Sequence, residues 1–223
     1  MLLNILAPRL CPVCGRTLLA AERLMCIGCD MDLPRLRISD LEFNEIHRRL
    51  GHATHIHRAA AWMQYKSGES YSSLILLAKY GGRPSLGLRL GQTFASEALP
   101  TGFFDGIDAI VPVPIHFTKR LRRGYNQTER ISSGISEVTG IPVMDVLRTV
   151  RTHGVQSRHG RDARFSAIAG TIALRKKARV AGLRLLLVDD IITTGATIAE
   201  CVRALQAGIP ASVSVASIAL ATS

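Results

Sequence analysis

The sequence has few aromatic residues and no long apolar run, and both absences narrow the functions it can serve. Aromatic residues make up 5% of the 223 residues, which argues against a surface on which the bases of a single-stranded nucleic acid stack. No apolar run reaches the roughly 20 residues that a membrane-spanning helix needs. The sequence also lacks the GxxxxGK[ST] phosphate loop, which excludes a P-loop nucleotide hydrolase.

A secretion signal is missing as well. The N-terminal stretch MLLNILAPRL has neither a basic first region nor an A-x-A cleavage site, and it runs directly into Cys11. We therefore interpret it as part of the mature protein and expect a cytoplasmic location. Thiols stay reduced in that compartment, so clustered cysteines favour a metal site over disulfides.

Acidic residues are scarce relative to basic ones. There are 17 Asp and Glu against 28 Lys and Arg, which gives a formal net charge of +11. Such an excess favours polyanionic partners, either nucleic acid or small ligands rich in phosphate. The charge balance alone does not choose between these two classes.

Four of the five cysteines form two CxxC pairs separated by eleven residues, in CPVCGRTLLAAERLMCIGCD. The four are Cys11, Cys14, Cys26 and Cys29. Each CxxC turn directs two thiolates to one point, so two turns complete a tetrahedral shell for Zn²⁺. A shell filled by four protein ligands indicates a structural zinc. Two redox-active pairs are the alternative, but no thioredoxin-like βαβ pattern surrounds them.

Two further features have both a functional and a structural interpretation. Cys201 lies on the apolar stripe of an expected helix over 196–206, so we expect it in the core. The stretch HATHIH places His52, His55 and His57 close together. They could bind a second metal ion, but we favour solvated side chains in a connecting segment.

Strand and helix patterns alternate from residue 59 onward, which predicts an α/β fold with a mainly parallel sheet flanked by helices. We expect strands at 59–65, 108–114, 171–175, 183–188 and 211–220. We expect helices at 71–80, after Pro84, from an Asn126 cap and at 196–206. The basic segments 115–125 and 151–166 are predicted to be loops. The expected organisation is a zinc module over 1–40, a linker over 41–58 and the α/β domain over 59–223.

The stretch VDDIITTGAT places two adjacent acids, Asp189 and Asp190, directly after the expected strand 183–188. Ligands of a parallel sheet bind beyond the carboxyl ends of its strands. Burying two acids without compensation is costly, so we expect both carboxylates near solvent or a bound partner. The amides and hydroxyls of 193–197 lie at the positive end of the next helix, where an anion is favoured. The pattern predicts a site for a phosphate joined to a polyol or to magnesium.

Over residues 185–197 the sequence resembles the binding motif for 5-phosphoribosyl-1-pyrophosphate (PRPP) of type I phosphoribosyltransferases, two acids and TTGxT after an apolar strand. From residue 11 to about 220 it also resembles the ComF family of competence-associated proteins. That likeness rests on CPVCG and CIGCD, YKSGE, AKYGG, VPVP, RRGYNQ and VDDIITTGAT, in this order. ComF proteins combine a zinc module with a phosphoribosyltransferase-like domain and are linked to uptake of transforming DNA.

The resemblance implies a type I phosphoribosyltransferase-like core and a magnesium-dependent phosphoribosyltransferase, or a PRPP-binding relative, of unknown acceptor. Asp189 and Asp190 would hold the ribose hydroxyls and be the catalytic acids. The 5-phosphate would lie against Thr193, Thr194, Gly195, Ala196 and Thr197. The pyrophosphate would lie near Arg122 and Arg123. Segment 151–164 would close over the ligand. Gln156 and Arg164 there fit the family pattern, whereas Ala167 stands where an asparagine is expected.

Charge considerations agree with group transfer from PRPP. Loss of pyrophosphate builds positive charge on the ribose and negative charge on the leaving group, and carboxylates, Mg²⁺ and arginines oppose these charges. The general base is not identified, with His153, His159 and Tyr125 as candidates. The alternative is a non-catalytic competence protein that binds single-stranded DNA or other competence proteins and uses this fold for binding or regulation. The run KRLRR could then contact DNA, or it could simply be a solvated face.

Overall fold

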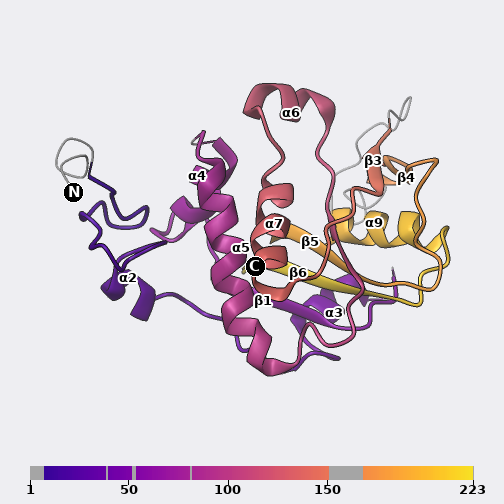
Figure 1. Ribbon diagram of the computed structural model, residues 1–223, viewed down its shortest axis with the longest axis horizontal. Helices are drawn as coiled ribbons and strands as arrows, with labels where there is room; N and C mark the ends of the chain where they lie inside the picture. Colours follow the sequence, from indigo (N-terminus) through magenta and orange to yellow (C-terminus); the bar gives the residue numbers. More distant parts are fainter. Residues whose placement is uncertain (1–7, 39, 52–53, 81, 151–167, 223) are drawn as a thin grey trace.

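The computed structural model describes residues 8–38, 40–51, 54–80, 82–150 and 168–222. Its centre is a four-stranded, wholly parallel sheet with the strand order β1-β6-β5-β2 (Figure 1). The strands are β1 (Ala59–Tyr65), β2 (Ala109–Pro112), β5 (Arg184–Ile192) and β6 (Ser212–Ala221). A separate antiparallel ribbon joins β3 (Leu147–Thr149) to β4 (Ile172–Leu174). The expected parallel α/β sheet is confirmed.

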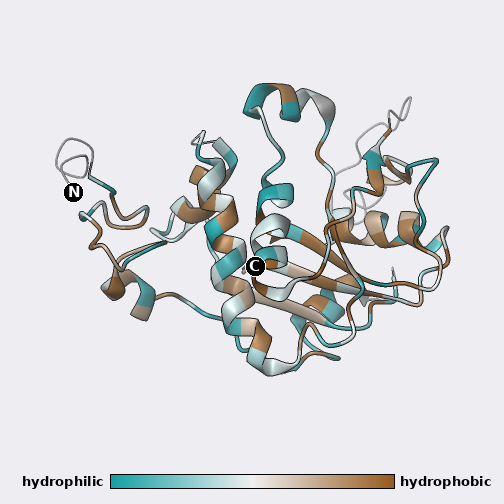
Figure 2. Cartoon of the chain, in the orientation of Figure 1, coloured by the Kyte–Doolittle hydropathy of each residue, from teal (hydrophilic) through white to brown (hydrophobic). Residues whose placement is uncertain are grey.

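Helices cover both faces of the sheet, and each face has its own apolar core. One core packs the sheet against α4 (Ser72–Tyr80), α5 (Pro84–Ala98) and α7 (Gln127–Thr139); the other packs it against α3 (Glu45–Leu50) and α9 (Ala196–Gln206). Strand β5 serves both, since Leu186 and Val188 point to the first core and Leu185 and Leu187 to the second. Figure 2 shows the hydrophobic residues concentrated along the sheet. A strand buried on both faces explains the uninterrupted apolar run in the sequence.

Helices α5 and α7 approach each other through glycines. A Cβ atom built on Gly91 would lie 2.1 Å from the carbonyl oxygen of Ile131, and one on Gly134 would lie 2.0 Å from the carbonyl oxygen of Leu88. No real side chain fits at such distances, so the two helix backbones touch at these positions. This contact holds α7, which supplies site residues described below, at a fixed distance from the rest of the first core.

Two segments differ from the expectations. Strand β5 does not end at Val188, because β6 continues beside it and pairs Asp189 with Ser217 and Ile192 with Leu220. The acid pair therefore lies within the last part of the strand. The predicted loop 115–125 contains a helix, α6 (Phe117–Arg123), which stands out from the body of the molecule (Figure 1). The His116 side chain caps its start and Gly124, at φ 78°, ends it.

The N-terminal part consists of the cysteine segment, which contains α2 (Ile27–Met31), and a strip that runs beside the sheet. Leu36 N donates to Trp62 O at 2.9 Å, and Gln64 N donates to Pro34 O at 2.8 Å, so residues 34–36 lie along the outer edge of β1. The proposed linker 41–58 contains α3, whose Ile46 and Leu50 are buried in the second core. A short 3₁₀ turn, η2 (Leu99–Thr101), follows α5. In the part of the chain described, no helix is long and apolar enough to cross a membrane.

Candidate functional site

The turn from β5 to α9 has the geometry of an anion-binding loop. Gly195 begins α9 at φ 85°, a conformation that favours glycine, and a Cβ there would lie 2.9 Å from Cδ2 of Leu50. No side chain caps this helix start at Gly195, and Ala196 N makes only a long, 3.5 Å contact with Thr194 Oγ1. The first amides of an eleven-residue helix thus lie at the carboxyl end of the sheet, where the helix dipole favours negative charge.

Helix α3 supports this loop from the second core. Arg49 donates to the carbonyl oxygen of Thr193 at 3.0 Å, and Leu50 fills the space beside Gly195. Thr193 itself is exposed, and Thr194 and Thr197 are half-buried. The loop is therefore held from behind by α3 while its threonine side chains keep access to solvent, as a binding loop requires.

Asp190 is buried and carries two contacts from other elements. Its side chain is 5% exposed, Lys79 Nζ of α4 lies 3.0 Å from Oδ1, and Gln127 Nε2 of α7 donates to Oδ2 at 2.7 Å. Of the two expected surroundings, solvent or a bound partner, the first does not hold for Asp190, whose partners here are side chains of α4 and α7. An ammonium group and an amide compensate the burial, which is the condition for keeping a charged carboxylate inside a protein.

Asp189 has a different environment from its neighbour. It is half-buried, and its Oδ1 accepts a hydrogen bond from Asp190 N at 2.8 Å. Burial of the carboxyl group, together with the negative charge of Asp190, raises the pKa of Asp189 to about 7, and the attraction of Lys79 offsets only part of this. Two adjacent acids thus differ: Asp190 is ion-paired, while Asp189 changes its charge near neutral pH.

Of the two arginines expected at the pyrophosphate, Arg123 belongs to the same hydrogen-bonded network as Asp190. Arg123 donates to Gln127 Oε1 at 2.8 Å and to the Tyr80 hydroxyl at 3.2 Å. Its guanidinium lies 4.7 Å from the centre of the Tyr80 ring, and that of the exposed Arg122 lies 5.7 Å away. The structure thus links Arg123 to the acid pair through Gln127, and Arg122 only through Tyr80.

Sequence reasoning missed Lys79, Tyr80 and Gln127 as site residues. These residues lie in the motifs AKYGG and RRGYNQ, which the sequence analysis used only to identify the family. No pattern within either motif indicates that the helix over residues 72–80 will contact β5.

Tyr125 donates its hydroxyl proton to Ala78 O at 2.7 Å, and burial raises the pKa of Tyr125. That favours a packing role over a general base. The histidines at 153 and 159, and positions 156, 164 and 167, lie outside the described residues.

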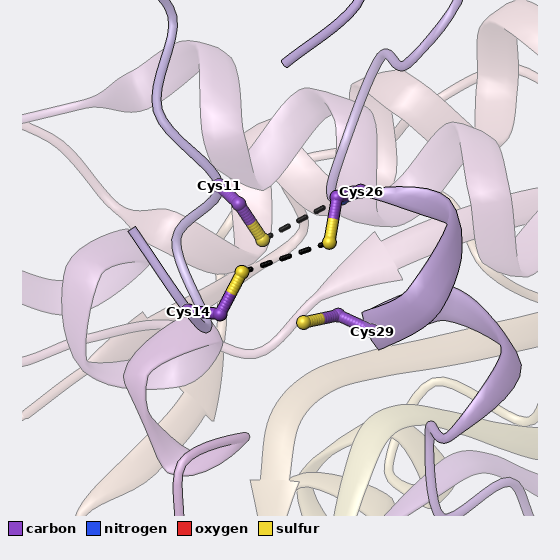
Figure 3. Close-up of side chains that lie close together, drawn as sticks. All are labelled: Cys11, Cys14, Cys26 and Cys29. Carbon is purple, nitrogen blue, oxygen red and sulfur yellow. Dashed lines mark hydrogen bonds between the residues drawn. The ribbon is translucent and has the colours of Figure 1, made fainter. Parts of the chain in front are cut away.

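The four N-terminal cysteines converge on one point (Figure 3). All four sulfur atoms lie within 4.8 Å of one another, and Sγ of Cys14 and Sγ of Cys26 are 3.6 Å apart. A tetrahedral zinc with bonds of about 2.3 Å separates its sulfur ligands by about 3.8 Å. The donor set and its spacing therefore fit Zn²⁺, and four ligands leave no open coordination position.

The thiols of this cluster differ in acidity. Burial opposes ionisation of Cys11, but amide hydrogen bonds from Cys14, Cys26 and Val13 outweigh it and lower its pKa to about 6. An amide hydrogen bond from Cys29 lowers the pKa of Cys26. Burial raises the pKa of Cys29. Amides that stabilise thiolates are what CxxC turns supply to a metal centre.

The remaining candidates fit the structural interpretation. Cys201 is fully buried in the second core, as expected, and burial raises the pKa of its thiol. His55 and His57 have exposed side chains, and His52 lies outside the described residues. Within the described ranges, the four cysteines are the only group of three or more potential ligands close enough to hold a metal ion.

Comparison with known proteins matches the phosphoribosyl transferase domain family to residues 99–223. DNA utilization protein YhgH of Salmonella typhimurium is 26% identical over 203 residues, 86% of this chain and 88% of its own length. YhgH of Escherichia coli K12 is 25% identical over 198 residues, 86% and 81% of the two chains. Competence protein F of Haemophilus influenzae is 33% identical over 101 residues, 44% of each chain.

Solved structures give lower similarity. The glutamine phosphoribosylpyrophosphate amidotransferase of B. subtilis aligns with a TM-score of 0.43 and 22% identity, over 63% of this chain and 30% of its own. A hypoxanthine phosphoribosyltransferase of Staphylococcus aureus aligns with a TM-score of 0.35 and 12% identity, over 59% of this chain and 61% of its own. The chain thus spans less than a third of the amidotransferase.

Proposed function

Because the chain belongs to the phosphoribosyl transferase domain family, we propose that it binds PRPP with Mg²⁺ at the carboxyl end of β5 and transfers the phosphoribosyl group to an acceptor. One observation carries the proposal: the acid pair lies at the carboxyl end of β5, and α9 begins at the same end, with no side chain hydrogen-bonded to its N-cap, Gly195. Carboxylates bind sugar hydroxyls, and helix N-termini bind phosphate. A ligand that has both groups joined together satisfies both halves of the site.

Each part of the ligand has a counterpart. The 5-phosphate is assigned to the loop Thr193–Thr197 and the ribose hydroxyls to Asp189 and Asp190. The pyrophosphate is assigned to the side of α6, where Arg122 is exposed and Nε of Arg123 has no hydrogen-bond partner among the described residues. Carboxylates and phosphate oxygens are the donors that Mg²⁺ prefers, and when bound it neutralises charge on the pyrophosphate.

The same arrangement suits transfer. As the bond to pyrophosphate breaks, positive charge develops on the ribose, and the carboxylates of Asp189 and Asp190 stabilise it. Negative charge develops on the departing oxygens, and the guanidinium groups of Arg122 and Arg123 oppose it. The hydrogen bonds that fix Arg123 and Asp190 before the ligand arrives reduce the reorganisation that the reaction would otherwise require.

For the cellular role, the relatives named DNA utilization protein and Competence protein F support a competence-associated phosphoribosyltransferase-like protein. Single-stranded DNA or competence proteins are proposed as further partners. The run KRLRR is a weaker candidate for a DNA contact, because Arg120 pairs with Glu129 at 3.0 Å and Arg123 is bound to Gln127 and Tyr80. Within this run, Arg122 is the exposed arginine without a carboxylate partner in the described structure.

Titration calorimetry with PRPP and Mg²⁺ tests the proposal. The wild type is expected to bind, and Asp189→Asn is expected to weaken binding at least tenfold, since an amide cannot replace a charged acceptor. The matched control is Asp108→Asn. Asp108 precedes β2 at the opposite end of the sheet, where it pairs with Arg184 at 3.0 Å. No heat with the wild type, or equal losses in both variants, would contradict a PRPP site at this end of β5.

The affinity for PRPP is expected to rise with pH. An acid with a pKa of about 7 is roughly one-tenth ionised at pH 6 and nine-tenths ionised at pH 8. If the ligand binds the ionised form of Asp189, the dissociation constant falls about tenfold between these values and then levels off. Since phosphate groups also titrate near pH 6, the comparison is made with Asp189→Asn, whose profile retains only the ligand's own titration. Parallel profiles for the two proteins would exclude Asp189 as the titrating group.

A further inference from the structure

Lys79 contacts the site from outside the part of the chain that the family comparison matches. It lies on α4, whereas the match begins at residue 99. Its Nζ nevertheless lies 3.0 Å from Oδ1 of Asp190, and both side chains are largely buried, with exposed fractions of 18% and 5%. An ammonium group withdrawn this far from solvent costs free energy, so its position calls for a physical reason.

The second oxygen of Asp190 is held just as specifically. Gln127 Nε2 donates to Oδ2, and the amide is itself oriented because Gln127 Oε1 accepts from Arg123. Arg123 in turn donates to the hydroxyl of Tyr80, the residue next to Lys79. A closed network therefore joins α4, α6 and α7 to the end of β5 and fixes both oxygens of one carboxylate.

These contacts leave acceptor capacity on Asp190. A carboxylate offers about four lone-pair directions, and the described structure uses one on each oxygen. Each oxygen can therefore accept one more hydrogen bond. A carboxylate that is held in one orientation and keeps free lone pairs is what recognition of a sugar diol requires.

We propose that Lys79 is a positioning residue of the PRPP site: with Gln127 it holds the Asp190 carboxylate in one orientation for the ribose hydroxyls. The proposal rests on the proposed function, and it adds to the site a residue from a helix that the matched domain does not include. Lys79 acts through Asp190 and is not assigned a contact with the ligand.

Lys79 is the cation in direct contact with Asp190 in the described structure. Lys79 faces it from α4, Asp189 adjoins it on β5, and Arg123 stands behind Gln127. Cys201 of α9 lies near Asp189, but burial keeps its thiol neutral. Without the ammonium group, Asp190 would stay buried beside Asp189 with no cation in contact, and its Oδ1 would lose the partner that orients it.

The test compares wild type, Lys79→Met, Asp190→Asn and the double variant, by calorimetry with PRPP and Mg²⁺ from pH 6 to 9. Lys79→Met is expected to weaken binding at least tenfold across this range, because the Asp190 carboxylate loses the contact that orients Oδ1. In the double variant the loss is expected to equal that of Asp190→Asn alone, because Lys79 acts only through that acid. Lys79→Arg, which keeps the charge, is expected to recover part of the affinity.

The control is Lys66→Met, since Lys66 forms an exposed ion pair with Glu69 and is expected to leave binding within twofold of wild type. Unchanged binding by Lys79→Met at every pH, or losses that add in the double variant, would overturn the role of Lys79. Failure of Lys79→Met to fold, with the double variant folding, would support a buried charge that needs its cation.

Denaturant unfolding of the same variants separates this proposal from the proposed function. If wild type gives no heat with PRPP, the proposal of a PRPP site is wrong, and the positioning role of Lys79 at that site is wrong as well. Unfolding would then still report whether Lys79 stabilises the fold through Asp190, because Lys79→Met should cost less stability in the Asp190→Asn background than in wild type. If wild type binds PRPP and the losses of affinity in the two single variants add up in the double variant, only the role of Lys79 would be contradicted.

Discussion

Replacing Cys11 and Cys26 with serine is expected to release zinc and unfold the N-terminal module. The two residues come from different CxxC pairs and are both buried, with exposed fractions of 3% and 4%. Structural zinc in comparable peptides contributes a binding free energy of about 10–16 kcal/mol, and without metal such peptides do not fold. The buried apolar side chains of this segment pack into the first core, so the metal is what would join the two CxxC turns to each other; they are Leu18, Leu24, Met25 and Leu33.

The measurement is zinc per chain by elemental analysis, together with protease sensitivity of the N-terminal segment. The matched control is Cys201→Ala, because Cys201 is a buried cysteine in another core and its loss should leave the zinc content at one per chain. Zinc content that stays at one after both replacements would defeat the metal assignment. A chelator added to wild type should reproduce the effect of the double replacement.

The second large effect is expected at the contact between α5 and α7. Gly134→Ala places a methyl group 2.0 Å from a backbone oxygen of α5, and Gly91→Ala places one 2.1 Å from a backbone oxygen of α7. Neither backbone can move without separating the helices, so each variant is expected to lose at least about 3 kcal/mol of unfolding free energy. The intrinsic preference of helices for alanine, about 1 kcal/mol, acts in the opposite direction and is too small to compensate.

Gly87→Ala provides the comparison within the same helix pair. Its Cβ would lie 3.1 Å from Cβ of Arg130, a contact that a displacement of a few tenths of an ångström relieves, and we expect a change of less than about 1 kcal/mol. Urea unfolding of the three variants measures the series. Equal stability of Gly134→Ala and wild type would mean that the helices are farther apart than described here. Because α7 carries Gln127, the two severe variants should also weaken binding of PRPP.

Much of the fold followed from patterns in the sequence. The helix over 196–206 has the bounds expected, and the runs at 59–65 and 211–220 form adjacent parallel strands. Periodicity succeeded there because each segment has one clear apolar face or a continuous apolar run between turn residues. The resemblances to type I phosphoribosyltransferases and to ComF proteins are confirmed by the matched domain and by relatives such as Competence protein F.

The predictions that differ from the structure have a common physical origin. In each case, contacts with residues distant in sequence determine the local structure. Strand β5 continues through the acids because β6 supplies pairing partners as far as Leu220. Asp190 is buried because Lys79 and Gln127 meet it from α4 and α7. Helix α6 was missed because a basic stretch with few apolar residues offers no periodicity, although the caps at His116 and Gly124 mark its ends. A single sequence does not state which helix will reach which strand.

Residues 34–36, which follow the cysteine segment, cover the outer edge of β1. An outer strand with exposed amides and carbonyls is a template onto which another chain can add, and natural sheets cover such borders. Here the chain that follows the four cysteines covers the edge. Arg35 holds it there through ion pairs with Asp30 and Glu97, and its guanidinium lies 5.8 Å from the centre of the Trp62 ring. Loss of metal would therefore expose the outer edge of β1 and promote self-association, whereas the proposed ligand site on β5, which β6 separates from β1, would keep its contacts.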